Sequence, residues 1–446
     1  MTSSLSVVMT NLREDVRKAK VAAIELAALD TVTKNAALKA MAEALDKGRQ
    51  KIIAANNVDM DAAEELKASG ELTDALVKRL KVTDDKISGM IDGINDIVKI
   101  KDPVGDTMST LELDDDLILY QIKCPIGVLG VIFESRPDVV PQIMSLCLKS
   151  GNAVVFKGGR EASNSNKMLF DILTEAASSA GIPKDCFVLM QTREDVNAIL
   201  KMDEYIDLLI PRGSNEFVKF IQNNTKIPVL GHSSGICHIY VDEYADLDKA
   251  LSVVLDSKIQ YPAVCNAVET LLVNSKIAME FLPEMAKLFV KNGVEVRADE
   301  RAISVMDGAV KASESDWDTE YNDLIISVKL VDSVAEAIHF INKHGSHHTD
   351  AIITEDKKSI ALFSKMVDSA DVFINTSTRF SDGYRFGKGA EVGISTNKVH
   401  SRGPVGMEGL MIYKYILVGD GQVVKDYAGK NAKKFKHIPL NKKFEF

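Results

Sequence analysis

The chain has 446 residues, of which 46% are hydrophobic and 26% charged, a globular composition with room for two or three domains. A net charge of -10 disfavours nucleic-acid binding. Five cysteines without a disulfide pattern fit a reducing cytoplasm, and no apolar run is long enough to span a membrane. The first residues also lack the basic start and apolar core of a secretory signal.

Residues 11–99 are expected to form helices, because apolar side chains recur there at helical spacing, as at Ile24 and Ala28. The pattern becomes extended near residue 109. A β-hairpin is predicted over 109–122, with three aspartates at 114–116 in its turn. Adjacent aspartates can bind a metal, but a solvated turn is the favoured interpretation.

Strands and helices alternate through the middle of the chain. The predicted strands lie at 153–156, 187–190, 206–210 and 236–241, and a second set at 269–273, 294–297, 324–331, 351–354 and 372–374. A helical pattern over 167–180 ends at Gly181. Such alternation predicts largely parallel sheets covered by helices. The two sets of strands predict two α/β domains.

Cys265 is the candidate nucleophile. It lies between a helix-like stretch and the apolar run 271–273. A thiolate attacks an acyl carbon readily and also leaves readily. A lone cysteine before an apolar run is more often a small buried side chain. Its place near the junction of two α/β domains, where ligand clefts are common, favours the catalytic interpretation.

Two glycine-containing turns follow predicted strands and precede helical segments. Their residues are Lys157, Gly158, Gly159, Arg160, Gly213 and Ser214. Glycine before a helix lets backbone N–H groups approach an anion, and a helix N-terminus favours negative charge. Each turn alone is also explained as a tight turn. Two of them in one parallel sheet predict a phosphate-bearing ligand, although no G-x-G-x-x-G fingerprint is present.

Two other polar segments are candidate binding sites. Loops like the glycine-rich segment 395–410 usually connect elements, but its basic and hydroxyl groups could also hold an anionic substrate. The segment 375–380 follows a predicted strand, where binding loops often lie. His344, His347 and His348 raise the question of a metal site. No cysteine or paired carboxylate completes a zinc-like spacing, so a polar turn is favoured and no metal is predicted.

Five segments, 125–137, 157–161, 260–267, 377–383 and 401–406, carry a family resemblance. They resemble γ-glutamyl phosphate reductases, a branch of the aldehyde dehydrogenase superfamily, and the similarity extends from about residue 10 to about residue 425. The resemblance implies an aldehyde dehydrogenase-like α/β fold of two parallel-sheet domains with a small β oligomerisation arm.

The resemblance also implies the limits of these parts. The NADP-binding domain is expected to comprise residues 1–108 and 124–237, and the catalytic domain residues 238–408. The oligomerisation arm and the C-terminal tail are expected to comprise 109–123 and 409–446.

The activity implied by the resemblance is NADPH-dependent reduction of L-glutamyl 5-phosphate, the second step of proline biosynthesis from glutamate. Cys265 would displace phosphate and form a thioester, and hydride transfer would give L-glutamate 5-semialdehyde. The backbone N–H of Cys265 is then expected to donate a hydrogen bond to the oxyanion. The implied substrate-binding residues are Arg136, Asn266, Arg379 and Arg402.

The cofactor contacts implied by the resemblance begin with Lys157, Gly158 and Gly159. Arg160 stands where NAD-preferring relatives often carry Glu, and a guanidinium there can pair with a 2′-phosphate, which favours NADP. Gly213 and Ser214 match pyrophosphate contacts, and Glu320 matches a contact with the nicotinamide ribose.

Val229 stands where oxidising aldehyde dehydrogenases carry a general-base Glu that activates water against the thioester. Its presence favours reduction over release of a free acid. Two alternatives stay open: an acid-releasing aldehyde dehydrogenase, and an inactive relative serving as an assembly subunit. The intact Cys265 and Lys157 argue against the second.

The hairpin 109–122 and the strand-like segment 411–418 suit oligomerisation, because exposed strand edges tend to be covered by pairing. A homodimer or homotetramer is expected. An unstable acyl phosphate would also gain from direct handover, so a glutamate kinase is a candidate partner. No nucleic-acid or membrane partner is expected.

Overall fold

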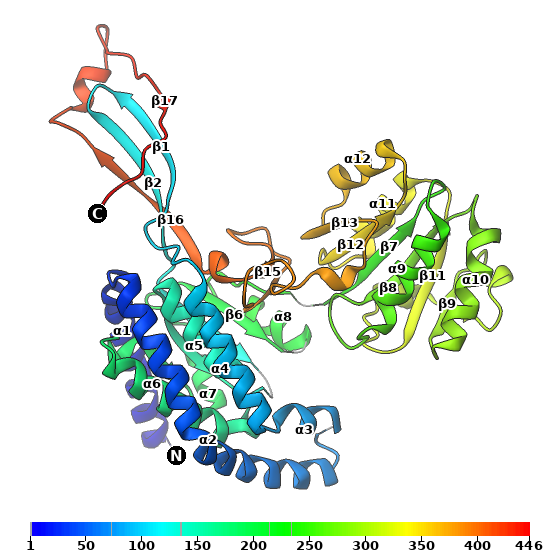
Figure 1. Cartoon of the computed structure of the whole chain (residues 1–446), viewed down its shortest axis with the longest axis horizontal. Helices are drawn as coiled ribbons and strands as arrows, with labels where there is room; N and C mark the ends of the chain where they lie inside the picture. Colours follow the sequence, from blue (N-terminus) through cyan, green and yellow to red (C-terminus); the bar gives the residue numbers. More distant parts are fainter. Residues whose placement is uncertain (1, 73, 134–135, 214, 233) are drawn as a thin grey trace. The chain divides into compact units, whose positions relative to one another are not determined.

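The computed structural model describes residues 2–72, 74–133, 136–213, 215–232 and 234–446 (Figure 1). The described residues form two compact units. Unit 1 contains those of residues 1–213, 220–229 and 406–446, and unit 2 contains those of 214–219 and 230–405.

Unit 1 begins with helices, as predicted for residues 11–99. They are α1 (Thr2–Ala27), α2 (Thr31–Ala68), α3 (Asp74–Leu80) and α4 (Asp84–Lys99). Two of them start at capping side chains. Asp30 accepts a hydrogen bond from the backbone of Thr33 at the start of α2, and Thr83 accepts one from Lys86 at the start of α4.

The sheet of unit 1 has four parallel strands in the order β5-β4-β3-β6. The strands are β3 (Val128–Phe133), β4 (Ala153–Lys157), β5 (Phe187–Leu189) and β6 (Leu208–Arg212). The associated helices are α5 (Val139–Ser150), α6 (Ser163–Ser179) and α7 (Arg193–Ile199). The next helix, α8 (Asn215–Asn223), is divided between the two units. Every residue of β3 is buried, as expected for an inner strand of a parallel sheet. The strand prediction omitted β3, because Gly130 interrupts its short apolar run.

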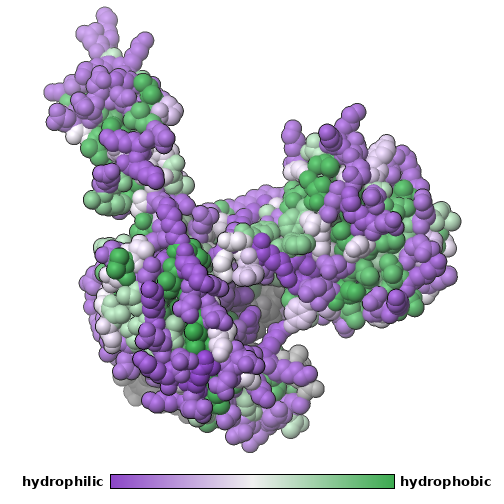
Figure 2. Space-filling model, viewed as in Figure 1, coloured by the Kyte–Doolittle hydropathy of each residue, from purple (hydrophilic) through white to green (hydrophobic). Residues whose placement is uncertain are grey.

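A second, antiparallel sheet in unit 1 forms an arm (Figure 1). Its order is β16-β2-β1-β17, with β1 (Thr107–Asp114), β2 (Leu117–Pro125), β16 (Met411–Val418) and β17 (Ile438–Pro439). The predicted hairpin and the predicted strand 411–418 are therefore both confirmed. Hydrophobic surface appears on the arm among hydrophilic residues (Figure 2), and β16 contributes the exposed side chains Ile412, Tyr413, Tyr415, Leu417 and Val418.

The C-terminal tail lies along β1. Thr110 donates a hydrogen bond from its Oγ1 to the backbone oxygen of Lys442 at 2.6 Å, and the rings of Phe444 and Tyr120 pack edge to face. β17 pairs with β1 through Ile438 and Pro439. The tail therefore occupies the β1 edge of the arm.

Unit 2 contains a seven-stranded parallel sheet in the order β10-β9-β11-β8-β7-β12-β13. The strands are β7 (Cys237–Val241), β8 (Val268–Asn274), β9 (Glu295–Ala298), β10 (Val310–Lys311), β11 (Ile325–Val331), β12 (Thr349–Ile353) and β13 (Asp371–Ile374). The helices are α9 (Leu247–Ile259), α10 (Ala278–Lys291), α11 (Val334–His344) and α12 (Lys357–Met366). A short antiparallel pair, β14 (Gly393–Ser395) and β15 (Gly403–Val405), completes the unit.

The two parallel sheets confirm the predicted α/β class. In unit 2 the sheet separates two hydrophobic cores, one that includes α9 and α10 and one that includes α11 and α12. The predicted limits and roles of the domains remain predictions. The observed division differs from them in placing the described residues of 214–219 and 230–237 with unit 2, and 406–408 and the arm with unit 1.

Candidate active site

Cys265 lies in the turn between α9 and β8, in unit 2, and its side chain meets an imidazole. The Sγ of Cys265 is 3.2 Å from Nε2 of His348. His348 directly precedes β12, is completely buried, and its Nδ1 lies 2.7 Å from the hydroxyl of Thr349. The parallel sheet thus brings together a thiol and an imidazole from the segments that precede two different strands, the arrangement that activates a cysteine nucleophile.

A second histidine stands beside this pair. His232, Cys265 and His348 each place one ligand-type atom within 4.8 Å of the others. The rings of His232 and His348 meet edge to face at 5.3 Å between centroids. Nδ1 of His232 is 3.1 Å from the backbone oxygen of Ile394, and it must be the donor because a carbonyl only accepts.

Neither histidine was a predicted site residue. The predicted polar turn at His348 is wrong for this side chain, because the structure buries it completely against the nucleophile. No role was predicted for His232. No local signal in the sequence could have paired them with Cys265, since the contacts arise from sheet topology.

The electrostatic setting keeps the imidazole neutral. Burial, together with the neighbouring His232, holds the pKa of His348 well below its usual value. A neutral imidazole is able to accept a proton from a thiol.

The other four cysteines are in different settings. Burial raises the pKa of the Cys186 thiol to about 12 and also raises the pKa values of Cys124, Cys147 and Cys237. These thiols stay protonated at neutral pH, and a protonated thiol is a poor nucleophile. Cys265 is half-buried and contacts His348, so it is the cysteine best suited to nucleophilic chemistry.

The backbone around Cys265 is tightly fixed. The thiol of Cys237 donates to the backbone oxygen of Cys265 at 3.2 Å. A Cβ atom built on Gly235 would lie 2.2 Å from that oxygen and 2.5 Å from Cβ of Cys265. The amide of Asn266 donates to the backbone oxygen of Ser381 at 2.7 Å, which ties the Cys265 turn to the loop after β13. These contacts hold the nucleophile in one position.

Arg379 is a buried cation near Cys265. Arg379 is only 9% exposed. Its Nε donates a hydrogen bond to the side-chain amide oxygen of Gln260, a neutral group, at 2.9 Å. Burial and the charge of Arg385 lower the pKa of Arg379, whereas negative charge on Cys265 raises it. The structure therefore brings Arg379 close to the nucleophile, with a neutral group as its hydrogen-bond partner.

The other predicted substrate arginines are engaged elsewhere. Arg402 donates two hydrogen bonds to Asp368, from Nη1 to the carboxylate at 3.2 Å and from Nη2 to the backbone oxygen at 3.0 Å. Its Nε donates a third hydrogen bond to the backbone oxygen of Thr396. Arg136 belongs to unit 1 and pairs with Asp138 at 2.8 Å. Neither contact places these two arginines beside Cys265.

The predicted cofactor turns lie at one edge of the sheet of unit 1. β4 and β6 flank β3, and β3 pairs Ile132 with Lys157 and Phe133 with Arg212. The carboxyl ends of β4 and β6 therefore meet at the edge where α/β folds bind ligands. Gly213 directly follows β6, and the predicted contact at Ser214 lies outside the described residues.

Two glycines in the turn after β4 allow neighbouring side chains to lie close to its backbone. Nζ of Lys157 donates to the backbone oxygen of Gly158. A Cβ on Gly158 would be 2.1 Å from Nδ2 of Asn166, and one on Gly159 would be 1.9 Å from Oε1 of Glu161. Oδ1 of Asn166 is buried and has no hydrogen-bond partner among the described residues. An unsatisfied buried acceptor beside this turn suits a ligand that donates a hydroxyl.

Glu320 precedes β11 in unit 2 and is half-buried. Burial raises the pKa of Glu269 to about 7, and the charge of Glu320 contributes to this increase. Glu269 forms a buried ion pair with Lys258 at 2.6 Å, and burial lowers the pKa of Lys258. Glu320 thus lies near an ion pair carried by α9 and by β8, the strand that follows the Cys265 turn.

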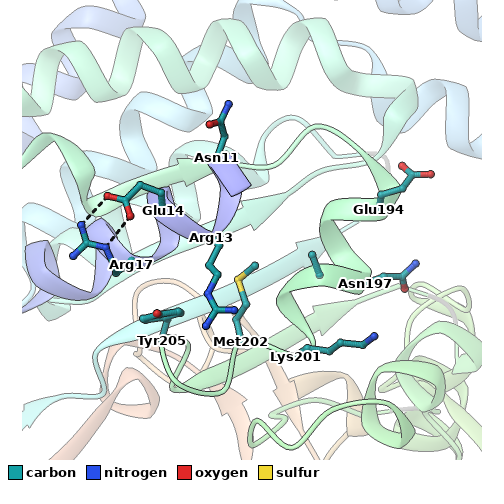
Figure 3. Close-up of a pocket in the computed structure, with 10 residues that line it drawn as sticks. Asn11, Arg13, Glu14, Arg17, Glu194, Asn197, Lys201, Met202 and Tyr205 are labelled. Atoms are coloured by element: carbon teal, nitrogen blue, oxygen red, sulfur yellow. Dashed lines mark hydrogen bonds and ion pairs between the residues drawn. The ribbon is translucent and has the colours of Figure 1, made fainter. Parts of the chain in front are cut away.

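A cavity of about 890 Å³ in unit 1 contains none of the predicted site residues (Figure 3). Its charged lining is largely neutralised, because Arg13 pairs with Glu204 and Arg17 with Glu14. Arg13 also lies 5.6 Å from the centre of the Tyr205 ring. The cavity offers no group suited to the chemistry of a thiol.

Comparison with known proteins identifies the class. The family model described as "Aldehyde dehydrogenase family" matches residues 9–305. Together with the fold and the cysteine site, this match shows that the chain belongs to the aldehyde dehydrogenase family, whose members use a nicotinamide cofactor.

Within that family the chain is similar to proteins named γ-glutamyl phosphate reductase. The one from Methanosarcina mazei is 64% identical over 441 residues, covering 98% of this chain and 99% of the relative, and the one from Methanosarcina barkeri is 63% identical over the same length. The crystal structure of γ-glutamyl phosphate reductase from Thermotoga maritima aligns with a TM-score of 0.89 and 41% identity, covering 92% of this chain and 99% of that chain. The resemblance inferred from sequence motifs is confirmed.

Proposed function

We propose that this chain reduces L-glutamyl 5-phosphate to L-glutamate 5-semialdehyde with release of phosphate, the second step of proline biosynthesis from glutamate. The names of its relatives support this substrate. The contact of 3.2 Å between Cys265 and His348 carries the proposal, because the reaction needs a thiolate that attacks an acyl carbon.

The proposed chemistry starts with proton transfer from the Cys265 thiol to Nε2 of His348. The thiolate then attacks the acyl carbon, the carbon–oxygen bond to phosphate breaks, and the imidazolium returns its proton to the departing phosphate. NADPH, when bound, supplies the hydride that reduces the Cys265 thioester. When the carbonyl re-forms, the carbon–sulfur bond breaks and Cys265 takes a proton from solvent. The backbone N–H of Cys265 is the proposed oxyanion donor.

Val229 supports reduction rather than hydrolysis of the thioester, since it replaces the Glu that aims water in oxidising relatives. His232 and His348 are bases close to the nucleophile, so the absence of that Glu does not leave the site without a base. We assign the binding of an anionic substrate group to Arg379, whose buried charge faces a neutral amide. Asn266, Arg136 and Arg402 are weaker candidates because each already makes a structural contact.

NADP is the proposed cofactor. Lys157, the glycine pair and Gly213 lie at the ligand-binding edge of a parallel sheet, and the unsatisfied Oδ1 of Asn166 suits a ribose hydroxyl. The exposed Arg160 is the proposed partner of the 2′-phosphate, because a guanidinium can pair with it. Ser214 and Glu320 remain proposed contacts with the pyrophosphate and the nicotinamide ribose.

The test is oxidation of L-glutamate 5-semialdehyde with NADP in the reverse direction. We expect reduction of NADP only when inorganic phosphate is present, and loss of activity in Cys265→Ala. Cys124→Ala, which removes a cysteine from the arm, is the matched control and should retain activity. Phosphate-independent reduction of NADP would instead identify an acid-releasing aldehyde dehydrogenase.

The exposed hydrophobic side chains of β16 support a homodimer or homotetramer, because an edge strand of this kind is usually covered by pairing. Light scattering that gives the monomer mass at micromolar concentration would contradict this assembly. The cytoplasm is the proposed location, in keeping with five free cysteines. Among the described helices, none has the length and apolar character needed to cross a membrane. A glutamate kinase remains a proposed partner.

A further inference from the structure

We propose that the side chains of Cys265, His232 and His348 form a binding site for Zn²⁺ that blocks the nucleophile reversibly. The site differs from the sequence-based expectation of no metal. Its binding step is independent of the proposed function, and only its inhibitory effect rests on that function.

The three side chains supply the ligands that zinc prefers. One thiolate and two neutral imidazoles match zinc sites with three protein ligands and an open fourth position, which water fills. Mg²⁺ and Ca²⁺ prefer sets of oxygen ligands and are poorly matched to sulfur and nitrogen. The chemistry of the cluster therefore selects a borderline-soft cation.

The distances suit one ion. Ligand atoms on a tetrahedral zinc ion are about 3.3 to 3.6 Å apart, as follows from zinc–nitrogen and zinc–sulfur bond lengths. The pair of Cys265 Sγ and His348 Nε2, at 3.2 Å, is already close to this separation. All three ligand atoms lie within 4.8 Å of one another, so the ligands must close by at most about 1.5 Å.

Both imidazoles are oriented by an outer partner, a feature of built metal sites. Nδ1 of His232 donates to the backbone oxygen of Ile394, which leaves the lone pair of the neutral ring on Nε2. Nδ1 of His348 contacts the hydroxyl of Thr349, and its Nε2 faces Cys265. Each ring is thus held in position through its Nδ1.

The burial of the cluster allows an ion to enter. His348 is buried, whereas His232 and Cys265 are half-buried, so two of the three ligand residues are partly accessible to solvent. Zinc bound to Sγ of Cys265 would occupy the electron pair needed for attack on the acyl carbon. Removal of the ion by a chelator would restore that electron pair.

The test measures binding directly, on the full chain without substrate. The reduced protein is titrated with Zn²⁺ by isothermal titration calorimetry, and with Co²⁺ to detect the absorption of a cobalt–thiolate bond. We expect one site per chain. Cys265→Ser should abolish the cobalt–thiolate absorption. His232→Gln and His348→Gln should each weaken binding by more than about tenfold, the loss typical even of altered outer partners.

His344→Gln is the matched control, because His344 contacts Asp318 and lies outside the cluster. It should bind Zn²⁺ as the unaltered protein does. A melting curve for each variant confirms that it is folded, and His232→Gln keeps the test valid if His348→Gln unfolds. Unchanged affinity in folded His232→Gln and His348→Gln, or no cobalt–thiolate absorption in the unaltered protein, would overturn the proposal. An inactive protein that still binds one Zn²⁺ through Cys265 would refute the proposed function and keep the metal site.

Discussion

Gly235→Ala is expected to inactivate the site while altering no catalytic group. The added Cβ would lie 2.2 Å from the backbone oxygen of Cys265 and 2.5 Å from its Cβ. Non-bonded carbon atoms prefer separations of about 3.5 to 4.0 Å, so the Cys265 turn must move by about 1 Å. A displacement of about 1 Å at a reacting group typically costs about 100-fold in rate. Overpacking of this kind also costs about 1–3 kcal/mol of folding stability.

The assay compares kcat for phosphate-dependent oxidation of the semialdehyde with the midpoint of chemical unfolding. The matched control is Gly93→Ala, in the interior of α4, where a Cβ meets nothing within 4 Å. That change should leave kcat unaltered and stabilise the protein by about 0.5–1 kcal/mol. A kcat for folded Gly235→Ala within about twofold of the unaltered protein would refute the claim that this glycine fixes the nucleophile.

Three further changes test other parts of the site. Above about pH 7, where the Glu269 carboxyl is ionised, Glu269→Gln should reduce folding stability by about 3–5 kcal/mol, because it leaves the Lys258 ammonium buried without its anion. Replacing both residues with apolar ones should cost less. Between pH 4.5 and about 7, the Glu269 carboxyl is more protonated in the folded state than in the unfolded state. Its contribution to the free energy of unfolding therefore falls as pH rises through that range. Glu269→Gln should remove this pH dependence, measured by urea unfolding at several pH values. Arg379→Gln should raise KM for phosphate in the reverse reaction about ten- to hundredfold, the value of one charge-assisted hydrogen bond, whereas Arg402→Gln should mainly lower the melting temperature; equal effects on KM would contradict the assignment. Arg160→Glu should shift the ratio of kcat/KM for NADP over NAD about ten- to hundredfold towards NAD, and an unchanged ratio would show that Arg160 does not contact the 2′-phosphate.

The sequence allowed the fold class to be predicted because periodicity is a local property. Helical spacing predicted the helical region 11–99, which contains α2 to α4 and most of α1, and short apolar runs located most strands of both parallel sheets. The strand β3 escaped prediction because Gly130 interrupts its short apolar run. The glycines after β4 and β6 could be recognised as turns because each turn and its strand are adjacent in sequence.

The neighbours of Cys265 could not be predicted in the same way. His348 is 83 residues from Cys265 in sequence, and the two meet because β12 and β8 both pair with β7. The partners of the arginines depend equally on folding. Arg402 and Arg379 look alike in the sequence, yet the first is tied to Asp368 and the second faces Gln260. Charge and loop position alone do not separate a structural arginine from a binding one.

The tail along β1 determines which edge of the arm sheet can accept a further strand. It covers one edge of the sheet, and β17 is a poor template for another strand because it has two residues, one of them a proline without an N–H. A strand added to this sheet must therefore join at β16, the opposite edge. Addition at one edge only cannot be repeated indefinitely, so contacts made through the arm favour closed assemblies over fibres.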